Sequence, residues 1–509
     1  MQNLTSQGFR LSPQQRQIWI SQQAFPAQSF RAVGAFVIAG NIDHDRLRRS
    51  LNRAVARNEI LRTTFQRPAG IKIPFQIVSD KIEVFYESCD LQELPEEQQM
   101  AAPFAAECKQ PLLLDDGPVL RCQVSELSAS RIALILSLPA LCADSRTLMN
   151  LATEIFHAYE SEDEVPAEEV VQYADFAEWQ NQLLESNDEH ALAGRAYWKN
   201  AAGQVPVLAL EKRLVEQRAP AYESVSFATG EALLDQLKNL ASENKARLED
   251  LLFLCWQALI SRLSTQRECT IYKRCDARKL DDLQSALGPF DRYLPIRCDF
   301  GSDLFGSQLA LVASELQHAE QIQDYADIED PARDVIAFEF EERTGLDTGK
   351  LSVSPADLFV FNHPFKLKLS CVVSGKQLSL RLHYDRTTFD AETCERFSGY
   401  LRRLLEAVAS GPASLRLAAI DLLSDAERRR LLFDLNETAT AYSRDMCVHE
   451  LFEAQAAKTP AAVAVICAGH QLTYEDLNIR ANQLAHLLRQ HGVGPNECVG
   501  MCLTRSVEM

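Results

Sequence analysis

The sequence predicts an α/β protein built from two or three domains, and three observations support this. The chain has 509 residues, which is more than a single hydrophobic core normally holds. Segments with the 3.6-residue period of amphipathic helices alternate with short runs rich in Val, Ile, Leu and aromatic residues, a pattern typical of strands. With 46% hydrophobic and 24% charged residues, the composition is that of a globular protein with enough apolar side chains for several cores.

The net charge of −19 argues against nucleic acids and anionic membranes as partners, because both attract a basic surface. The N-terminal sequence MQNLTSQGFR lacks the basic start and apolar core of a signal peptide, and no apolar run reaches the length of a membrane span. We therefore expect a cytoplasmic protein with neither a nucleic-acid nor a membrane partner.

The cysteines favour reduced thiols over disulfides or a metal site. The chain contains 14 of them without a secretion signal, and many are expected to be small core residues. Cys498 and Cys502 are the closest pair, but no second pair or nearby histidine cluster completes a zinc site. We expect no bound metal.

In the N-terminal part, helices and strands alternate. Residues 44–59 place Leu47, Leu51 and Val55 on one helical face and arginines elsewhere, which indicates either a solvated basic face or a docking surface. Residues 121–140 are typical of a hairpin that leads into the apolar run 132–148. That run is too short to span a membrane and is best explained as a central strand buried on both faces.

A second set of elements follows an acidic loop at 161–170. Residues 248–263 are apolar nearly all round and predict a buried helix. Paired strands are expected at 358–362, 367–374 and 377–385. Beyond a linker, alternating helix and strand patterns indicate the beginning of a further α/β domain. Its last predicted strand is 497–502.

Several segments, taken in order, resemble the condensation domain of nonribosomal peptide synthetases over residues 9–430. They match its first, second, fourth and fifth motifs and its late strands: LSPQQRQIW (11–19), ARNEILRTTF (56–65), YADFAEWQ (173–180), LGPFDRYLPI (287–296), HPFKLKLSCVV (363–373) and LHYDRTTFD (382–390). From His449 the chain resembles the start of an adenylation domain. The matching segments are LTYEDLNIRANQLAHLL (472–488) and VGMCLTRSVEM (499–509).

This resemblance implies two chloramphenicol-acetyltransferase-like lobes, a V-shaped pseudo-dimer with a tunnel between them. The expected boundaries are 1–175 for the N-terminal lobe, 176–433 for the C-terminal lobe, 434–447 for a linker and 448–509 for a partial adenylation domain. The adenylation family's phosphate-binding loop would lie beyond Met509, so the chain is not expected to adenylate a substrate by itself.

The resemblance also implies the partners. A working family member joins a donor and an acceptor that arrive on the 4'-phosphopantetheine arms of peptidyl carrier proteins, and it binds no cofactor directly. We therefore expect donor and acceptor carrier proteins, the adenylation domain of the same chain and a tailoring enzyme acting in trans as partners. Because no carrier domain precedes this one, the donor should arrive on a separate protein.

The third family motif, His-His-x-x-x-Asp-Gly, is altered here. Aligned on Asp144, its two histidines become Pro139 and Ala140. In the family the aspartate is structural and pairs with the arginine of the second motif, here Arg62. Removing one partner of such a buried pair costs about 3 to 5 kcal/mol. Asp144 is therefore interpreted as a retained scaffold residue, with a direct catalytic part as the alternative.

Other motif positions also depart from the family. Asn58 replaces a usual histidine and Ser145 the glycine after the aspartate, and the fifth motif contains Asp291, Arg292 and Tyr293 instead of a small polar Asn and Thr. Arg292 could fill the tunnel, bind an anionic substrate or form a salt bridge with Asp291. The candidate catalytic residues are thus Asp144, Arg292 and Tyr293.

Two further chemistries are less favoured by the residues. The heterocyclisation branch has Asp-x-x-x-x-Asp-x-x-Ser; Thr147 could replace its serine, but Pro139 replaces its first aspartate. Cys142 is a possible nucleophile, but a thiol in an apolar run is inert and no histidine is near in sequence. His157 follows on a helix and is better explained by packing.

Two functions remain. The first is a platform without ordinary amide-forming activity, which docks carrier proteins and the adenylation domain. The second is an enzyme with altered chemistry on a carrier-bound acyl or aminoacyl group. The two differ in whether an open tunnel reaches Asp144 or is plugged by Arg292 or Tyr293.

Overall fold

The protein, described by a computed structural model, is a mixed α/β chain that divides into two compact units, Met1–Leu423 and Ser424–Met509. The predicted fold class is therefore confirmed. The structure describes residues 8–81, 83–91, 96–111, 114–115, 117, 119–128, 130–161, 170–201, 203, 205–212, 220–264, 266, 268–299, 304–327, 335–347, 350–412, 414–442 and 444–509. Most of the acidic loop expected at 161–170 lies outside these residues.

The first unit contains two six-stranded sheets. The N-terminal sheet has the order β12-β13-β2-β7-β6-β5. Helices α2 and α4 pack together beside it, and α3 contacts β2 and β7. The bounds are Arg31–Ala39 for β2, Phe85–Asp90 for β5, Arg121–Ser128 for β6, Arg131–Pro139 for β7, Leu346–Asp347 for β12, Ser352–Val360 for β13, His44–Arg57 for α2, Glu96–Glu107 for α3 and Ser145–Glu160 for α4. The predicted helix at 44–59 and hairpin at 121–140 are thus confirmed.

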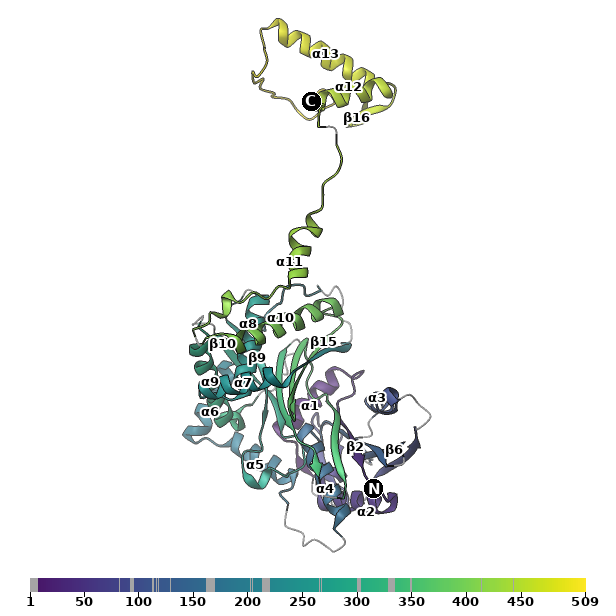
Figure 1. Ribbon diagram of the computed structural model, residues 1–509, viewed down its shortest axis with the longest axis vertical. Coiled ribbons are helices and arrows are strands. Elements are labelled where there is room, and N and C mark those ends of the chain that lie inside the picture. Colours follow the sequence, from purple (N-terminus) through teal and green to yellow (C-terminus); the bar gives the residue numbers. More distant parts are fainter. Residues whose placement is uncertain are drawn as a thin grey trace. The chain divides into compact units, whose positions relative to one another are not determined.

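The second sheet has the order β10-β9-β11-β14-β15-β8, and Figure 1 shows its strands beside helices α7 to α10. The bounds are Tyr222–Thr229 for β8, Glu268–Asp276 for β9, Asp291–Asp299 for β10, Ile336–Arg343 for β11, Leu367–Ser374 for β14, Gln377–Asp385 for β15, Glu231–Glu243 for α7, Leu248–Ser264 for α8, Phe305–Ile322 for α9 and Ala391–Ser410 for α10. The buried helix predicted at 248–263 is α8.

The two faces of this second sheet differ in chemistry. Ile271, Leu294 and Phe338 belong to the apolar core that contains α8. Because side chains alternate along a strand, their neighbours Tyr272 and Tyr293 lie on the other face and belong to the core of the N-terminal half. The functional groups of β9 and β10 are therefore presented between the two sheets.

After β7 the chain passes to the second sheet, and it then crosses between the sheets twice more. After β11 it enters the N-terminal sheet, where β13 pairs antiparallel with β2 in the register Val353↔Ile38 and Leu358↔Gly34. It then returns to the second sheet as β14, which pairs with β11 and β15. The strand predicted at 358–362 is thus present, but its expected pairing with 367–374 is wrong. Residues 346–360 complete the N-terminal sheet although the expected boundary put them in the C-terminal lobe.

Smaller elements complete the first unit. A three-stranded sheet has the order β1-β4-β3, and its Phe65 lies in the same apolar core as Phe36 and Leu136 of the N-terminal sheet. Helices α5 and α6 follow α4 along the chain. The bounds are Phe9–Arg10 for β1, Thr63–Gln66 for β3, Phe75–Val78 for β4, Pro13–Ala24 for α1, Tyr173–Glu185 for α5 and Glu189–Ala201 for α6, with 3₁₀ turns at Glu59–Arg62, Asp281–Leu283, Gln323–Tyr325 and Leu417–Ala419. Among the described residues, none of the helices is long and apolar enough to cross a membrane.

The second unit begins at Ser424, whose hydroxyl accepts the Glu427 N–H and caps α11. Its elements are α11 (Asp425–Leu432), a 3₁₀ turn (Asp434–Asn436), α12 (Val448–Lys458), the hairpin β16 (Val463–Cys467) and β17 (His470–Thr473), and α13 (Tyr474–Gln490). The strand predicted at 497–502 is wrong: this segment is irregular. A strand needs a hydrogen-bonded neighbour, and β16 and β17 pair with each other.

Candidate functional site

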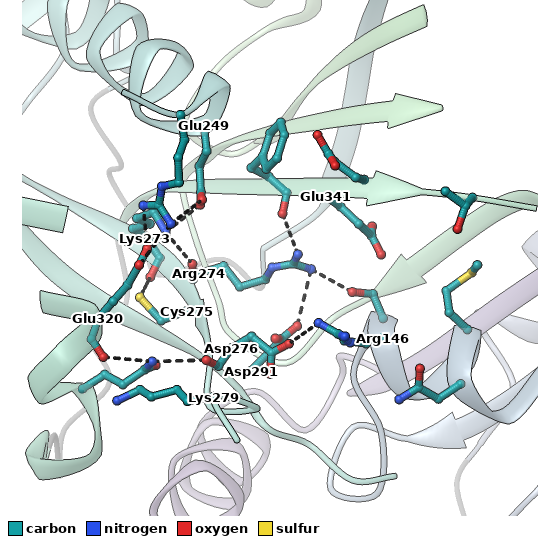
Figure 2. Close-up of a pocket in the computed structure, with 18 of the residues that line it drawn as sticks. Arg146, Glu249, Lys273, Arg274, Cys275, Asp276, Lys279, Asp291, Glu320 and Glu341 are labelled. Carbon is teal, nitrogen blue, oxygen red and sulfur yellow. Dashed lines mark hydrogen bonds and ion pairs between the residues drawn. The ribbon is translucent and has the colours of Figure 1, made fainter. Parts of the chain in front are cut away.

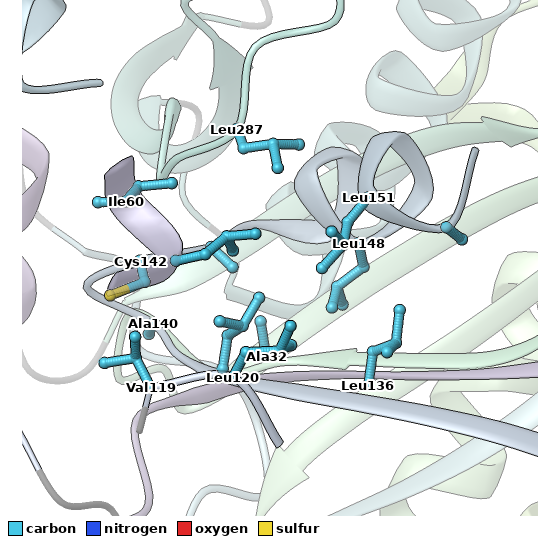
Figure 3. Packing of buried hydrophobic residues seen from close by; sticks show 14 of the residues in the cluster. Ala32, Ile60, Val119, Leu120, Leu136, Ala140, Cys142, Leu148, Leu151 and Leu287 are labelled. Atoms are coloured by element: carbon cyan, nitrogen blue, oxygen red, sulfur yellow. The ribbon is translucent and has the colours of Figure 1, made fainter. Parts of the chain in front are cut away.

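The third-motif positions lie where β7 ends and α4 begins. Pro139 is the last residue of β7, the Ala140 N–H donates to Phe30 O at 3.0 Å, and the Cys142 N–H donates to Pro139 O at 2.8 Å. Ala140 and Cys142 are both 0% exposed. Figure 3 shows them among Ile60, Val119 and other apolar side chains. The segment predicted to align with the family's third motif thus lies in an apolar core.

The other nucleophile and base considered near this motif are placed unfavourably. Burial raises the pKa of the Cys142 thiol well above its ordinary value, so the reactive thiolate is suppressed. His157 is exposed in the last turn of α4. At 1.5 Å per residue, 13 residues of helix put it about 20 Å from Asp144. Neither residue joins a catalytic arrangement at the third motif.

Asp144 is the N-cap residue of α4 and is 0% exposed. Its Oδ1 accepts the Thr147 N–H at 2.7 Å, and its Oδ2 accepts the N–H groups of Phe290 and Asp291 at 2.8 and 3.1 Å. The carboxylate therefore caps a helix and anchors the loop that precedes β10. An N-cap aspartate of this kind satisfies a helix N–H that would otherwise lack a partner.

The expected Arg62–Asp144 salt bridge is wrong, because the partner of Asp144 is Arg278. The Arg278 guanidinium donates to both carboxylate oxygens at 2.9 and 3.0 Å, and both side chains are fully buried. Burial alone would raise the pKa of Asp144, but Arg278 and the bonds from Thr147 outweigh burial and lower it. Arg62 instead donates to Ser79 O at 2.6 Å and lies 3.7 Å from a Glu59 oxygen.

Arg278 also binds the rest of the loop between β9 and β10. It donates to Ala286 O and Gly288 O, both at 3.1 Å, and its guanidinium lies 4.2 Å from the Phe290 ring centroid. Gly288 has a φ of +149°, and a Cβ there would lie 2.0 Å from Tyr173 Cδ2. Only glycine fits this close approach. Asp144 is therefore engaged entirely in joining α4 to this loop.

The fifth-motif residues point to opposite sides of β10. The Arg292 guanidinium is buried and donates to Ala326 O at 2.6 Å and to Gln323 O at 3.5 Å. Burial lowers the pKa of Arg292. The expected Arg292–Asp291 salt bridge is not formed, because Asp291 lies 3.4 Å from Arg274 instead. Arg292 thus anchors the turn after α9.

Tyr293 is buried and its hydroxyl donates to Glu339 Oε2 at 2.5 Å. Lys368 donates to the same oxygen at 3.1 Å, and Ser370 donates to the other oxygen of that carboxylate. Burial raises the pKa of Tyr293 well above its ordinary value, and Glu339 raises it further. The tyrosine is therefore a fixed hydrogen-bond donor, and its assignment as catalytic stays a prediction.

The remaining altered positions make structural contacts. Asn58 Nδ2 donates to both Glu154 oxygens at 3.0 Å and to Ala54 O at 2.9 Å. Ser145, at the first position of α4, accepts a hydrogen bond from Arg274 at 2.7 Å. Ser145 thereby connects the altered motif to the second sheet.

A cleft of about 850 Å³ opens between α4 and the second sheet. Figure 2 shows Arg146, Arg274, Asp276 and Asp291 at its inner wall. Its lining is mostly charged: Ser145, Arg146, Met149, Asn150, Thr153, Arg247, Glu249, Lys273, Arg274, Cys275, Asp276, Lys279, Asp291, Gln317, Glu320, Gln321, Gln323, Phe340, Glu341, Glu342, Thr344, Gly345 and Leu346. The cleft ends at Ser145 and Asp291, whereas the fully buried Asp144 lies behind them.

Neither the role of Arg278 nor a chemical role for Asp291 was predicted from the sequence. Arg278 is far in sequence from Asp144, and no periodicity signals their pairing. Asp291 could have been noticed as a carboxyl added to the fifth motif next to two other atypical residues. Among the residues that the structure describes, no cluster of histidine, cysteine and carboxylate side chains is arranged to hold a metal ion.

The sequence matches known protein families and individual proteins. Residues 6–432 match the family model described as a condensation domain, and residues 452–509 match that of an AMP-binding enzyme. The chain is 32% identical over 520 residues to tyrocidine synthase 3 of Brevibacillus parabrevis, covering 98% of this chain and 8% of that protein. It therefore spans a small fraction of that relative's length.

Two solved structures are also similar. A four-domain nonribosomal peptide synthetase, holo-AB3403 bound to AMP and glycine, covers 97% of this chain and 40% of its own length with a TM-score of 0.76 and 20% identity. The X-domain in the complex of the X-domain and OxyB from teicoplanin biosynthesis covers 83% of this chain and 98% of its own, with a TM-score of 0.67 and 21% identity. These likenesses establish the fold.

Proposed function

Because the chain belongs to the condensation-domain family of nonribosomal peptide synthetases, we propose that residues 6–432 form a platform for carrier proteins and the adenylation domain, without amide formation through the third motif. One observation supports this proposal: the motif positions Pro139 and Ala140 are buried in an apolar core, and the Asp144 carboxylate is paired with Arg278. A reacting amine therefore meets neither space nor a base there.

The expected loss in reaction rate without a positioned acid or base supports this proposal. A positioned acid or base contributes about 10²- to 10⁴-fold to a rate. Holding two tethered substrates together can still supply about 7 to 11 kcal/mol. A platform of this kind would thus retain slow transfer by proximity alone, with no contribution from the third motif.

We propose that its partners are donor and acceptor carrier proteins, with substrates on 4'-phosphopantetheine arms, and the adenylation domain that begins after the linker. A tailoring enzyme acting in trans is a further proposed partner. The X-domain, which has the same fold, occurs in a complex with OxyB. A condensation fold with a sealed motif is suited to the same kind of docking.

A second function is altered chemistry on a carrier-bound acyl or aminoacyl group. The observation that favours it is the cleft of about 850 Å³, whose inner wall carries Arg274 and Asp291. Asp144, Arg292 and Tyr293 are less suited as the reacting groups, since none of the three lines the cleft and each is bonded to a partner. Heterocyclisation is the least favoured form, because Pro139 and the sealed core occupy its motif.

The platform is tested by intact-protein mass spectrometry of carrier proteins. A donor carrier loaded with an acyl group and an acceptor loaded with an amino acid are incubated with the parent chain, with Ala140→His and with Ser29→Ala as a control variant outside the motif. We expect at most slow transfer, supported by proximity alone, from the parent and the control. Fast transfer by the parent would contradict the platform. Transfer gained by Ala140→His alone would mean that docking sites are intact and that only the base is missing.

A further inference from the structure

Asp291 is the carboxylic acid at the inner end of the cleft. It is the first residue of β10, and its side chain lies on the same face as that of Tyr293, toward the space between the sheets. The side chain is 3% exposed, and this small exposed part lines the cleft. A molecule that fills the cleft would therefore meet this carboxyl group as it reaches the wall (Figure 2).

The cation beside Asp291 is shared with other groups. Arg274 Nη1 lies 3.4 Å from Asp291 Oδ2 and donates to Ser145 Oγ at 2.7 Å, while its Nη2 donates to Phe340 O at 2.7 Å. Glu339 and Glu341 on β11 also act on the Arg274 charge. Arg274 thus positions Asp291 without forming a bidentate pair with it.

Two carboxylates face Asp291 from the neighbouring elements. Asp144 comes from the start of α4 and Asp276 from the end of β9, and Arg278 from the following loop partly compensates them. Burial raises the pKa of Asp291 well above its ordinary value; Arg274 lowers it, and the nearby Asp144 and Asp276 charges raise it further. A carboxyl whose proton affinity is raised in this way is a stronger base than an ordinary aspartate and is suited to accept and return a proton.

Three other carboxylates of the cleft are held in close ion pairs. Glu341 accepts two bonds from Arg343, at 2.7 and 3.0 Å. Glu249 lies 2.6 Å from Lys273 Nζ, and Glu320 accepts bonds from Arg247 at 2.8 and 3.0 Å. Burial alone would raise the pKa of Glu320, but Arg247 and Lys273 outweigh burial and lower it. Asp291 differs from Glu320 in that its pKa is raised.

We infer that Asp291 is the proton-transfer residue for attack of an amine on a carrier-bound thioester in this cleft. The inference rests on the second proposed function, altered chemistry. In the step, the amine nitrogen forms a bond to the acyl carbon and gives one proton to the Asp291 carboxylate. The carbon–sulfur bond breaks, and the sulfur takes that proton from Asp291 to leave as a thiol, so the products are an amide and the free carrier thiol.

The experiment compares the full chain with Asp291→Asn, Asp291→Ala and Glu268→Gln. Asparagine keeps the shape of the side chain but cannot transfer the proton. Glu268 lies at the far end of β9, is 56% exposed and pairs with Arg297, so its change to glutamine is a matched loss of a carboxylate away from the cleft. Transfer is followed by mass spectrometry between carriers loaded with acetyl, octanoyl or glycyl groups and an acceptor loaded with glycine. The rates are measured from pH 5 to 9.

In the expected result the parent rate rises with pH and then levels off, because the base form of Asp291 is required. Asp291→Asn lowers the rate about 10²- to 10⁴-fold and removes this pH dependence, formate restores part of the rate of Asp291→Ala, and Glu268→Gln behaves as the parent. Difference infrared spectra at pH 5, above the ordinary range of an aspartate, should show a protonated carboxyl band in the parent that Asp291→Asn lacks. Thermal unfolding confirms that each variant is folded.

The outcomes that would contradict the role of Asp291 also distinguish it from the two proposed functions. Transfer by the parent that survives unchanged in Asp291→Asn overturns the role of Asp291 and leaves altered chemistry standing. No transfer by the parent from any of the three donors overturns altered chemistry, and the role of Asp291 with it, and leaves the platform. Absence of the protonated carboxyl band at pH 5 overturns the inference whatever the transfer rates are.

Discussion

Replacing Arg278 by methionine should be one of the most destabilising single changes in the first unit. The guanidinium is fully buried and donates six hydrogen bonds, two of them to Asp144. Methionine fills much of the volume but leaves the Asp144 carboxylate buried without a cation. Breaking a buried pair in this way costs about 3 to 5 kcal/mol.

Arg62→Met is the matched control, because the same change removes the arginine that the sequence suggested. Arg62 has a side chain 17% exposed, one bond to Ser79 O and a 3.7 Å approach to Glu59. Its loss should cost about 1 kcal/mol. The difference of about 3 kcal/mol between the variants corresponds to a folding equilibrium changed on the order of 100-fold.

The assay is urea unfolding followed by tryptophan fluorescence. All four tryptophans of the chain, Trp19, Trp179, Trp198 and Trp256, lie in the first unit, so the signal reports that unit alone. A lower midpoint with an unchanged slope would measure the loss of stability. Equal midpoints for Arg278→Met and Arg62→Met would refute the reasoning that Arg278 compensates the buried Asp144 charge.

The same pair predicts a pH dependence. In the parent the pKa of Asp144 is below the ordinary aspartate value of 3.8. Its contribution to stability is therefore present above that value and is lost as pH falls through the lowered pKa. Without Arg278, burial raises the pKa of Asp144, and the variant then loses stability as pH rises through about 4. The deficit of Arg278→Met should therefore shrink when unfolding is measured below about pH 4.

Three further predictions follow from particular contacts. Gly288→Ala should lower the unfolding midpoint strongly, because the added Cβ would lie 2.0 Å from Tyr173 Cδ2. Gly399→Ala is the matched control: Gly399 lies in open space on α10, and the change should raise the free energy of unfolding by about 0.5 to 1 kcal/mol. Cys142 should stay unmodified by a thiol reagent in the folded chain, because it is fully buried, while the exposed cysteines of the second unit react; its modification at the same rate would contradict the sealed core. Burial lowers the pKa of His363 to about 4, so the parent should lose stability between about pH 6.5 and 4 and His363→Gln should lose less, as measured by thermal unfolding across that range.

The elements with a strong local signal were predictable. Helix α8 and the hairpin β6–β7 follow from periodicity and apolar runs, since each is decided by neighbours close in sequence. The place of β13 was not predictable in this way. Its strand character is local, but its pairing with β2 joins residues more than 300 positions apart. The segment 497–502 has strand composition, yet composition supplies no neighbouring strand.

The candidate site was also only partly predictable from the sequence. The burial of the apolar run 132–148 was predictable from the sequence, and the structure places Ala140 and Cys142 in the core. The identity of the cation that compensates Asp144 depends on how the loop after β9 folds back onto α4, so Arg62 was expected instead of Arg278. The exposure of Asp291 to the cleft likewise depends on which residues of β10 face α4.

The insertion of β13 into the N-terminal sheet has a consequence for synthesis on the ribosome. The last strand contributed by the N-terminal lobe itself, β7, ends at Pro139, whereas β13 begins at Ser352. At 5 to 20 residues per second, the roughly 200 residues between them take on the order of 10 to 40 s to emerge. Throughout that interval one edge of β2 has no partner, and such an edge can pair with another nascent chain. The nascent protein therefore passes through a period of vulnerability to chaperone capture or misassembly that ends only when its second lobe is largely translated.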